Sequence, residues 1–224
     1  MNNSAVVTSR VSGGRAERFP SKMPCFGMAD WREVYGVEFT PWQIEVAHEF
    51  PWGENVLYSS CPFNPGRMVC ETHVAFLGLE TINIMVLQRL NPANAAPRFY
   101  DYLPNSWYST EAFANEVTLS FRWYLLLRGI VPNSEDKTFK EQTAMLPGEY
   151  EVPSAVAETA KNLLIFKKIG VHVNGNRYAR TADLDSARAR VSVGVCDTTG
   201  VRICDRWDDF CSSRMGVGAS RKPE

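Results

Sequence analysis

The sequence predicts an α+β fold in which two helices pack on a small, mostly antiparallel sheet, preceded by an irregular N-terminal extension. Size is the first observation, since 224 residues with 45% hydrophobic and 12% aromatic side chains can bury one sizeable core. The second is helical periodicity in the middle of the chain, and the third is a change to strand-like alternation after Gly170. A single domain with a substantial extension is therefore expected.

The expected extension has two parts. Residues 1–24 are polar and lack the apolar centre of a secretory signal, so we expect a flexible arm. Residues 25–72 are rich in Trp, Pro and Gly and should form an irregular aromatic segment packed on the domain, with one short helix at Pro41–Phe50. The domain itself is expected to span residues 73–224.

The domain begins with two short apolar runs, His73–Leu79 and Ile82–Leu87. Either run could be a buried strand, and the second could also be a helical turn. Aromatic residues before and after these runs could line a binding groove, although such side chains more often fill the core beneath long loops. These residues are Trp31, Trp42, Trp52, Phe99, Tyr100, Tyr102, Trp107 and Tyr108.

Two longer helices are predicted in the middle of the chain. The first spans Thr110–Arg128, because apolar residues recur there at steps of three and four and Gly129 can close the last turn. The second spans Pro153–Lys168, with proline in its first turn and Gly170 just past its end. These two helices are expected to cover the sheet.

Three short strands are predicted after Gly170, at residues 191–195, 200–204 and 215–219. Alternation within the first two predicts which side chains face the core and which face solvent. The expected inward residues are Val191, Val193, Val201 and Ile203. The expected outward residues are Ser192, Arg202 and Cys204.

The net charge and hydropathy exclude several kinds of partner. The formal net charge is −1 and no apolar run reaches membrane-spanning length. We therefore expect neither nucleic acid nor a membrane as a partner. Because no export signal is evident, we expect the protein to be cytoplasmic or assembled into a larger particle.

The composition changes sharply near the end of the chain. Between Gly170 and Arg221 there is no Glu, Lys or Gln, although sixteen Glu in 224 residues would place about 3.7 in these 52 positions (16 × 52/224). The stretch nevertheless holds eight Arg and six Asp. The presence of Arg without Lys, and of Asp without Glu, resembles a codon bias. Solvent exposure alone would favour neither member of each pair over the other. Chance combined with strand and turn propensity is the alternative explanation.

Residues 149–170, EYEVPSAVAETAKNLLIFKKIG, resemble the loop-and-helix signature of C-type-lectin-like domains of the formylglycine-generating-enzyme type. Residues 178–184 (YARTADL) and 190–221 fall where that family has its terminal segments. The resemblance covers about the last 75 residues. It implies a C-type-lectin-like fold for the domain.

The C-terminal segments also resemble the variable proteins of diversity-generating retroelements. The residues that carry this resemblance are RTADLDS (180–186), RVSVG (190–194), GV (200–201), RWDD (206–209) and GVGASRK (216–222). In that family a reverse transcriptase miscopies adenines, so that AAC codons become NNC codons, which cannot encode Glu, Lys, Gln, Met or Trp. The resemblance therefore implies a diversified region at about 180–221, where these residues are depleted.

The resemblance also implies roles for individual positions. Trp207, Met215 and Lys222 cannot come from NNC codons and would belong to the constant scaffold. The positions expected to be diversified and ligand-binding are Ser192, Val195, Cys196, Asp197, Arg202, Cys204, Asp205, Arg206, Asp209, Phe210, Ser212 and Arg214. The implied function is binding of a macromolecule, expected to be a protein, without a cofactor or catalysis. The oligomeric state is left open.

Two other functions are alternatives. A cysteine- or metal-dependent enzyme could use the same fold, and a structural component of a phage or cell surface could use it without diversification. Cys61, Cys70 and His73 form a weak candidate for a zinc site, because C-x8-C-x2-H supplies two thiols and an imidazole. Buried thiols with a hydrogen-bonded histidine are the more common outcome, so no metal is expected. Cys196 and Cys211 are weaker candidates for thiol chemistry.

Overall fold

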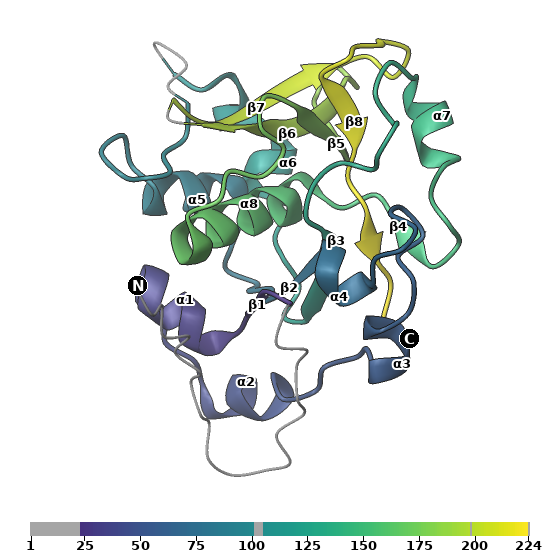
Figure 1. Cartoon of the computed structure of the whole chain (residues 1–224). Coiled ribbons are helices and arrows are strands. Elements are labelled where there is room, and N and C mark those ends of the chain that lie inside the picture. Colours follow the sequence, from purple (N-terminus) through teal and green to yellow (C-terminus); the bar gives the residue numbers. More distant parts are fainter. Residues whose placement is uncertain (1–22, 101–104, 198, 224) are drawn as a thin grey trace, which may run out of the picture.

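The computed structural model describes residues 23–100, 105–197 and 199–223, apart from the side chains of Val195 and Cys196. Within this part the protein has a mixed α+β architecture, with eight α-helices and two small sheets (Figure 1). The predicted α+β class is therefore confirmed. The arm expected at residues 1–24 lies outside the described residues except for Met23 and Pro24, and Met23 is buried in the core.

The helices are mostly short. They are α1 (Met28–Tyr35), α2 (Pro41–Val46), α3 (Glu54–Leu57), α4 (Val69–Thr72), α5 (Ile84–Leu90), the 3₁₀ helix η1 (Trp107–Thr110), α6 (Ala112–Asn115), α7 (Phe139–Thr143) and α8 (Ala155–Ile169). The strands are β1 (Cys25–Phe26), β2 (His73–Leu77), β3 (Trp123–Leu127), β4 (Tyr150–Glu151), β5 (Tyr178–Leu184), β6 (Arg190–Asp197), β7 (Gly200–Arg206), β8 (Met215–Val217) and β9 (Ser220–Arg221).

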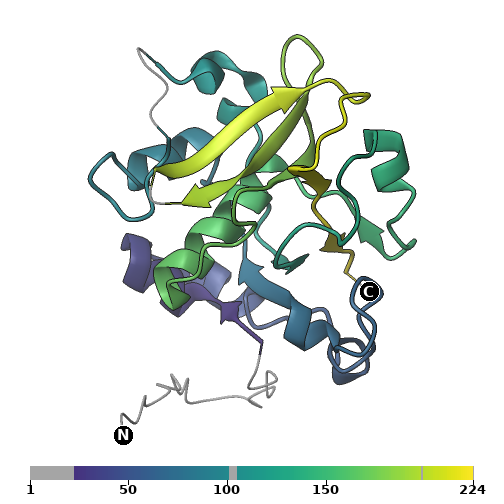
Figure 2. The same ribbon diagram turned by 45° about the horizontal axis from the view of Figure 1, so that its top comes forward.

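The strands form two separate sheets. The first sheet has the order β1-β2-β3-β9-β4 and the second has the order β7-β6-β5-β8. Pairing is antiparallel except between β1 and β2 and between β5 and β8. Figure 2 brings the second sheet forward and shows its two long strands, β6 and β7, crossing above α8. The second sheet contains most of the positions that were expected to be diversified.

Helix α8 is the central element of the core. The Ser154 side chain caps it by accepting from the Ala157 amide at 3.3 Å, and Gly170 ends it with a left-handed φ of 74°. All its residues from Ala155 to Ile165 are buried. The helix predicted at Pro153–Lys168 is therefore confirmed, and it supports β5 and β6 from beneath.

The helix predicted at Thr110–Arg128 is wrong. The chain forms η1 and α6 there and then the strand β3, all five residues of which are buried. Strand β3 pairs with β2 on one side and with β9 on the other. Because β3 is covered on both faces, its residues are apolar throughout and lack the alternation that marks a half-exposed strand.

The other element predictions mostly hold. The runs at His73–Leu79 and Ile82–Leu87 correspond to β2 and α5, so the helical alternative is correct for the second. Strands β6, β7 and β8 lie where three strands were predicted. Residues 25–72 are more regular than expected, since they hold β1 and the helices α1 to α4. Most of the described candidate groove aromatics lie in or against the core instead.

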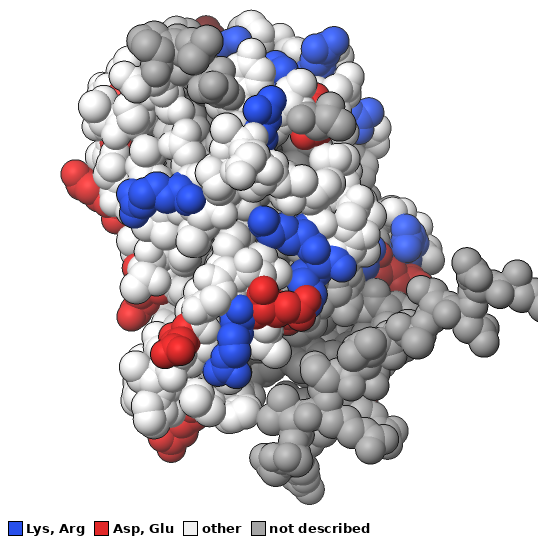
Figure 3. All heavy atoms as spheres, turned by 90° about the vertical axis from the view of Figure 1, so that its left-hand side faces the viewer, with Lys and Arg blue, Asp and Glu red and all other residues white. Residues whose placement is uncertain are grey.

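The outer surface carries charges of both signs. On the face shown in Figure 3, positive and negative side chains are scattered among uncharged ones, as the formal net charge of −1 suggests. None of the helices in the described ranges is long and apolar enough to span a bilayer.

Candidate functional site

The second sheet has an inner face toward α8 and an outer face away from it. Val193 pairs with Ile203 across β6 and β7, and both side chains are fully buried on the inner face, together with Val191 and Val201. The prediction of these four inward residues is confirmed. The strand frame is therefore held by apolar packing on one side.

The expected exposure of Ser192 is wrong. Register places Ser192 opposite both Cys204 and Arg180, on the outer face as alternation predicts, but the side chain is fully buried. The chain that follows β7 folds back over this part of the sheet, and Met215 Sδ lies 4.0 Å from the Ser192 hydroxyl. Ser192 therefore belongs to the buried layer beneath the surface and cannot contact a ligand directly.

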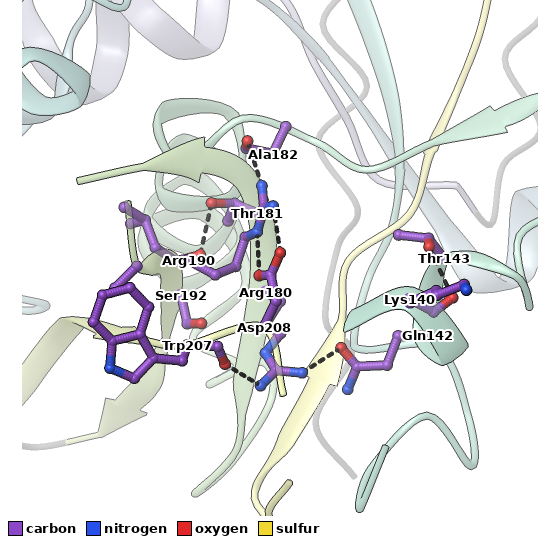
Figure 4. A network of polar contacts seen from close by, with 12 residues as sticks. Lys140, Gln142, Thr143, Arg180, Thr181, Ala182, Arg190, Ser192, Trp207 and Asp208 are labelled. Carbon is purple, nitrogen blue, oxygen red and sulfur yellow. Dashed lines mark hydrogen bonds and ion pairs between the residues drawn. The ribbon is translucent and has the colours of Figure 1, made fainter. Parts of the chain in front are cut away.

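Arg180 holds this returning chain in place. Its guanidinium is buried on the outer face and donates to the Trp207 carbonyl and to Gln142 Oε1 (Figure 4). It also donates to the carbonyls of Lys137 and Phe210. Burial lowers the pKa of Arg180, and the nearby Asp208 carboxylate acts in the opposite direction. One side chain thus joins β5 to α7 and to the loop after β7.

Gln142 extends the same network. Its side chain is buried in α7, and its amide nitrogen donates to the carbonyls of Ser134 at 2.8 Å and Met215 at 2.9 Å. The Thr138 side chain caps α7 in a reciprocal arrangement with Glu141. Sequence reasoning did not identify Arg180 or Gln142, because nothing in the local pattern indicates that a polar side chain will be covered.

Arg190 provides a second anchor. It forms two parallel bonds to the Asp208 carboxylate, both 3.0 Å long, and donates to the Ala182 carbonyl at 2.7 Å. Its guanidinium also stacks on the Phe139 ring at 3.9 Å. A bidentate pair of this kind fixes orientation as well as distance. Asp208 is therefore a structural residue within the exposed loop.

Residues 207–214, called the 207–214 loop below, combine a fixed backbone with outward side chains. The Phe210 amide donates to the Trp207 carbonyl at 3.1 Å, and the Ser212 carbonyl accepts from Asp136 at 3.1 Å. Yet Trp207 is 59% exposed and Phe210 is 42% exposed. Ser212 is half-buried, whereas Asp209, Cys211 and Arg214 are exposed. Asp208 and Ser212 form hydrogen bonds that help to hold the loop, whereas the exposed Trp207 indole and Asp209 carboxylate form none within the described residues.

The outer positions of β7 continue this surface. The Arg202 guanidinium stacks on the Tyr100 ring at 4.2 Å and donates to the Thr199 hydroxyl at 3.2 Å. Arg206 is exposed and lies over the Phe210 ring at 5.6 Å. Cys204 between them is half-buried, and desolvation raises the pKa of its thiol to about 12. The predicted outward direction of Arg202 and Cys204 is confirmed, although both are partly covered.

The remaining predicted positions lie at the end of β6 and near the end of β7. Asp197 accepts from the hydroxyl and the amide of Thr199, and these bonds lower the pKa of the Asp197 carboxyl. Asp205 is half-buried near the end of β7. The side chains of Val195 and Cys196 lie outside the described part of the structure.

The three residues expected to belong to the scaffold, Trp207, Met215 and Lys222, differ in burial and in contacts. Met215 is buried beneath the surface, as a scaffold residue should be. Lys222 is exposed but tied to the fold, since its ammonium donates to the Gly148 carbonyl and its own carbonyl accepts from Trp52 Nε1. Trp207 is not a core residue: its carbonyl is bound by Arg180 while its indole points away from that guanidinium (Figure 4).

The weak zinc candidate does not assemble. Cys61, Cys70 and His73 are all buried, and the described residues contain no group of three or more His, Cys, Asp or Glu that could hold a metal ion. His73 Nδ1 is 2.9 Å from the Thr72 hydroxyl and its Nε2 is 3.2 Å from the Tyr150 hydroxyl. Both ring nitrogens thus have hydrogen-bond partners. This arrangement matches the alternative expectation of a buried, hydrogen-bonded histidine.

Comparisons with known proteins add no family to this picture. A scan of protein-family models found no match, and searches of curated proteins and of solved structures gave no significant match to this chain.

Proposed function

We propose that this chain is a ligand-binding protein whose surface is diversified by a retroelement, with a C-type-lectin-like scaffold beneath it. The binding surface consists of the outer positions of β7 and the 207–214 loop. Its ligand is a macromolecule, most simply a protein, and binding needs no cofactor or catalytic group. The protein works in the cytoplasm or as part of a larger particle.

One observation carries the proposal: the loop is held through its backbone carbonyls and Asp208, and not through the side chains that we propose bind the ligand. Arg180 and Arg190 bind the loop through the carbonyls of Trp207 and Phe210 and through Asp208. Within the described part of the structure, the exposed Asp209 and Arg214 side chains form no hydrogen bond or ion pair. Replacement of such side chains costs little stability, typically within about 0.5 kcal/mol each.

Composition and geometry support the proposal together. The segment without Glu, Lys and Gln includes both the frame of the second sheet and its exposed surface. Exposed Phe210 and the nearby Arg206 are the side-chain types that dominate protein interfaces, and a fixed backbone lowers the entropy cost of binding. A pre-ordered surface of this type suits recognition of proteins better than enclosure of a small molecule.

A library experiment tests the proposal. Codons for Arg206, Asp209, Phe210 and Arg214 are replaced by NNC in a displayed full-length chain, and folding is scored by protease resistance. Most members should fold, and selection against several unrelated proteins should yield specific binders. The matched control library randomises the buried inner residues Val191, Val193, Val201 and Ile203 and should mostly fail to fold.

Two outcomes would remove the proposal. The surface library could lose protease resistance as often as the control library, which would make these positions structural. Alternatively, the genomic locus could lack a near-copy of the 3′ part of the gene, differing mainly at adenines, beside a reverse-transcriptase gene. Either result would leave no basis for diversification of this surface.

A further inference from the structure

Helix α2 is placed without burying any of its own residues. None of the residues Pro41–Val46 is buried, while Trp42 is 58% exposed and Ile44 is 41% exposed. A six-residue helix is too short to be stable alone in water, and its usual source of stability is an apolar face packed against the core. The reciprocal cap between Thr40 and Gln43 accounts for the start of α2 only.

An apolar pocket adjoins this helix. The pocket has a volume of about 290 Å³, and its lining includes Val46, Phe50, Phe121 and Trp123. Trp42 lies at its edge, since the Trp42 and Phe121 rings are 5.8 Å apart. Figure 1 shows α2 at the opposite end of the molecule from β6 and β7. This surface is therefore separate from the proposed ligand-binding surface.

The charges around the α2 surface are mostly negative. Glu38, Glu45 and Glu49 are exposed on or beside α2, and Glu49 also lines the pocket. Arg122 is the basic residue in the pocket lining, and it pairs with Glu151 at 3.8 Å. Exposed aromatic and aliphatic side chains with a rim of carboxylates favour a basic partner that also carries apolar residues.

The first 22 residues of this chain have that composition. They contain Arg10, Arg15, Arg18 and Lys22 against a single acid, Glu17. Their apolar residues include Val6, Val7, Val11 and Phe19. We propose that residues 1–22 dock on the α2 surface of the same molecule, with their apolar side chains on Trp42 and Ile44 and their basic groups beside the glutamates.

Residues 1–22 join the described part of the chain close to the α2 surface. A Cβ on Gly27 would lie 3.3 Å from the Trp123 indole, and Nε1 of that indole donates to the carbonyl of Ala47, the residue that ends α2. Residue 22 is only five positions before Gly27, so the segment starts within about 17 Å of this junction. Because the segment is tethered this close to the α2 surface, its effective concentration there is high. Weak contacts are then enough for docking. The inference does not depend on the proposed function.

Limited proteolysis of the full chain tests the inference. Trypsin cleavage after Arg10, Arg15 and Arg18 is followed by intact mass. If the segment is docked about nine-tenths of the time, cleavage should be about tenfold slower in wild type than in the double variant W42S/I44S. Raising NaCl from about 50 to 500 mM should speed the wild-type cleavage, because exposed charges are then screened.

A second measurement keeps the test informative if a variant folds poorly. Amide exchange of residues 44–47 should be faster in the charge-reversal variant R10E/R15E/R18E than in wild type, because the substitutions remove the basic groups of the docking segment. All three substitutions precede residue 23, where the described part of the structure begins. The matched control is Trp207→Ser, which removes an equally exposed tryptophan at the opposite end and should alter neither rate.

Three results would overturn the inference. Equal cleavage rates in wild type and W42S/I44S would mean that Trp42 and Ile44 do not hold the segment. Unchanged amide exchange in the charge-reversal variant would mean that the basic groups do not contribute. Protection of α2 that rises with protein concentration, together with the mass of a dimer in sedimentation, would assign the surface to a second copy.

Discussion

The buried guanidinium of Arg180 donates to the backbone carbonyl of Phe210, thirty residues later in the chain, while the Phe210 ring remains 42% exposed. At Phe210, therefore, the backbone is held by Arg180, whereas the side chain takes no part in that contact. Arg180 holds the loop through this carbonyl, and the ring is left partly exposed to solvent.

Replacing Arg180 by lysine should destabilise the protein by about 2–4 kcal/mol, although the positive charge is kept. The lysine ammonium cannot reach acceptors on α7 and on the loop together, so buried carbonyls lose their partner. Urea unfolding measures the loss. Exchange of the Phe210 amide, which donates to Trp207, should also become faster. Arg188→Lys, an exposed residue, is the control and should change stability by less than about 0.5 kcal/mol.

The triple variant D209A/F210A/R214A should unfold at nearly the wild-type temperature. Each side chain is exposed and should contribute within about 0.5 kcal/mol. Differential scanning calorimetry checks the result. Ile203→Ala, a buried residue of the same sheet, should cost about 2–5 kcal/mol for comparison. A large fall in the triple variant would show that the loop side chains are part of the scaffold.

The Glu158–Lys161 pair is fully buried in α8, with 2.5 Å between Lys161 Nζ and Glu158 Oε1. Burial lowers the pKa of Lys161, and Glu158 opposes that shift. Glu158→Gln should therefore cost about 3–5 kcal/mol, because it leaves a buried ammonium without its counter-charge.

The double variant E158Q/K161M tests that explanation, since it removes the unpaired charge and should be more stable than Glu158→Gln alone. Glu33→Gln breaks the exposed contact with Lys168 and should cost less than about 1 kcal/mol. If both single substitutions cost the same in urea unfolding, burial is not the cause.

His73 should make stability depend on pH in mildly acidic solution. Burial lowers the pKa of its imidazole from 6.5 to about 3, so between these values the unfolded chain binds a proton that the folded chain does not. Stability should fall as pH is lowered through this window, by up to about 1.4 kcal/mol per pH unit. Urea unfolding at several pH values should show a shallower dependence in His73→Gln. Equal slopes would contradict the assignment.

Local sequence pattern predicted the elements that are stabilised locally. Helix α8 has a serine at its N-cap, apolar residues at helical spacing and a glycine just after its last turn. The sequence therefore predicted its bounds to within two residues. Strand β3 was assigned to a helix because its identity depends on β2 and on β9, which comes from nearly one hundred residues later. The local periodicity of residues 123–127 therefore cannot indicate pairing with β9, which is so distant in the sequence.

The candidate surface was predicted in the same partial way. Alternation gave the correct face for Ser192, Arg202 and Cys204, since face depends only on strand geometry. It could not give the burial of Ser192, which depends on how the 207–214 loop returns over the sheet. For the same reason the buried anchors Arg180 and Gln142 became visible only in the structure.

The position of β9 has a genetic consequence. Ser220 and Arg221 lie between β3 and β4 in the first sheet, yet they are translated after every position that we propose is diversified, the last of which is Arg214. A copying error that shifted the reading frame before codon 220 would remove this strand and leave two sheet edges open. If the gene is rewritten as we propose, completion of the first sheet would therefore require the rewritten segment to be read in frame to codon 221.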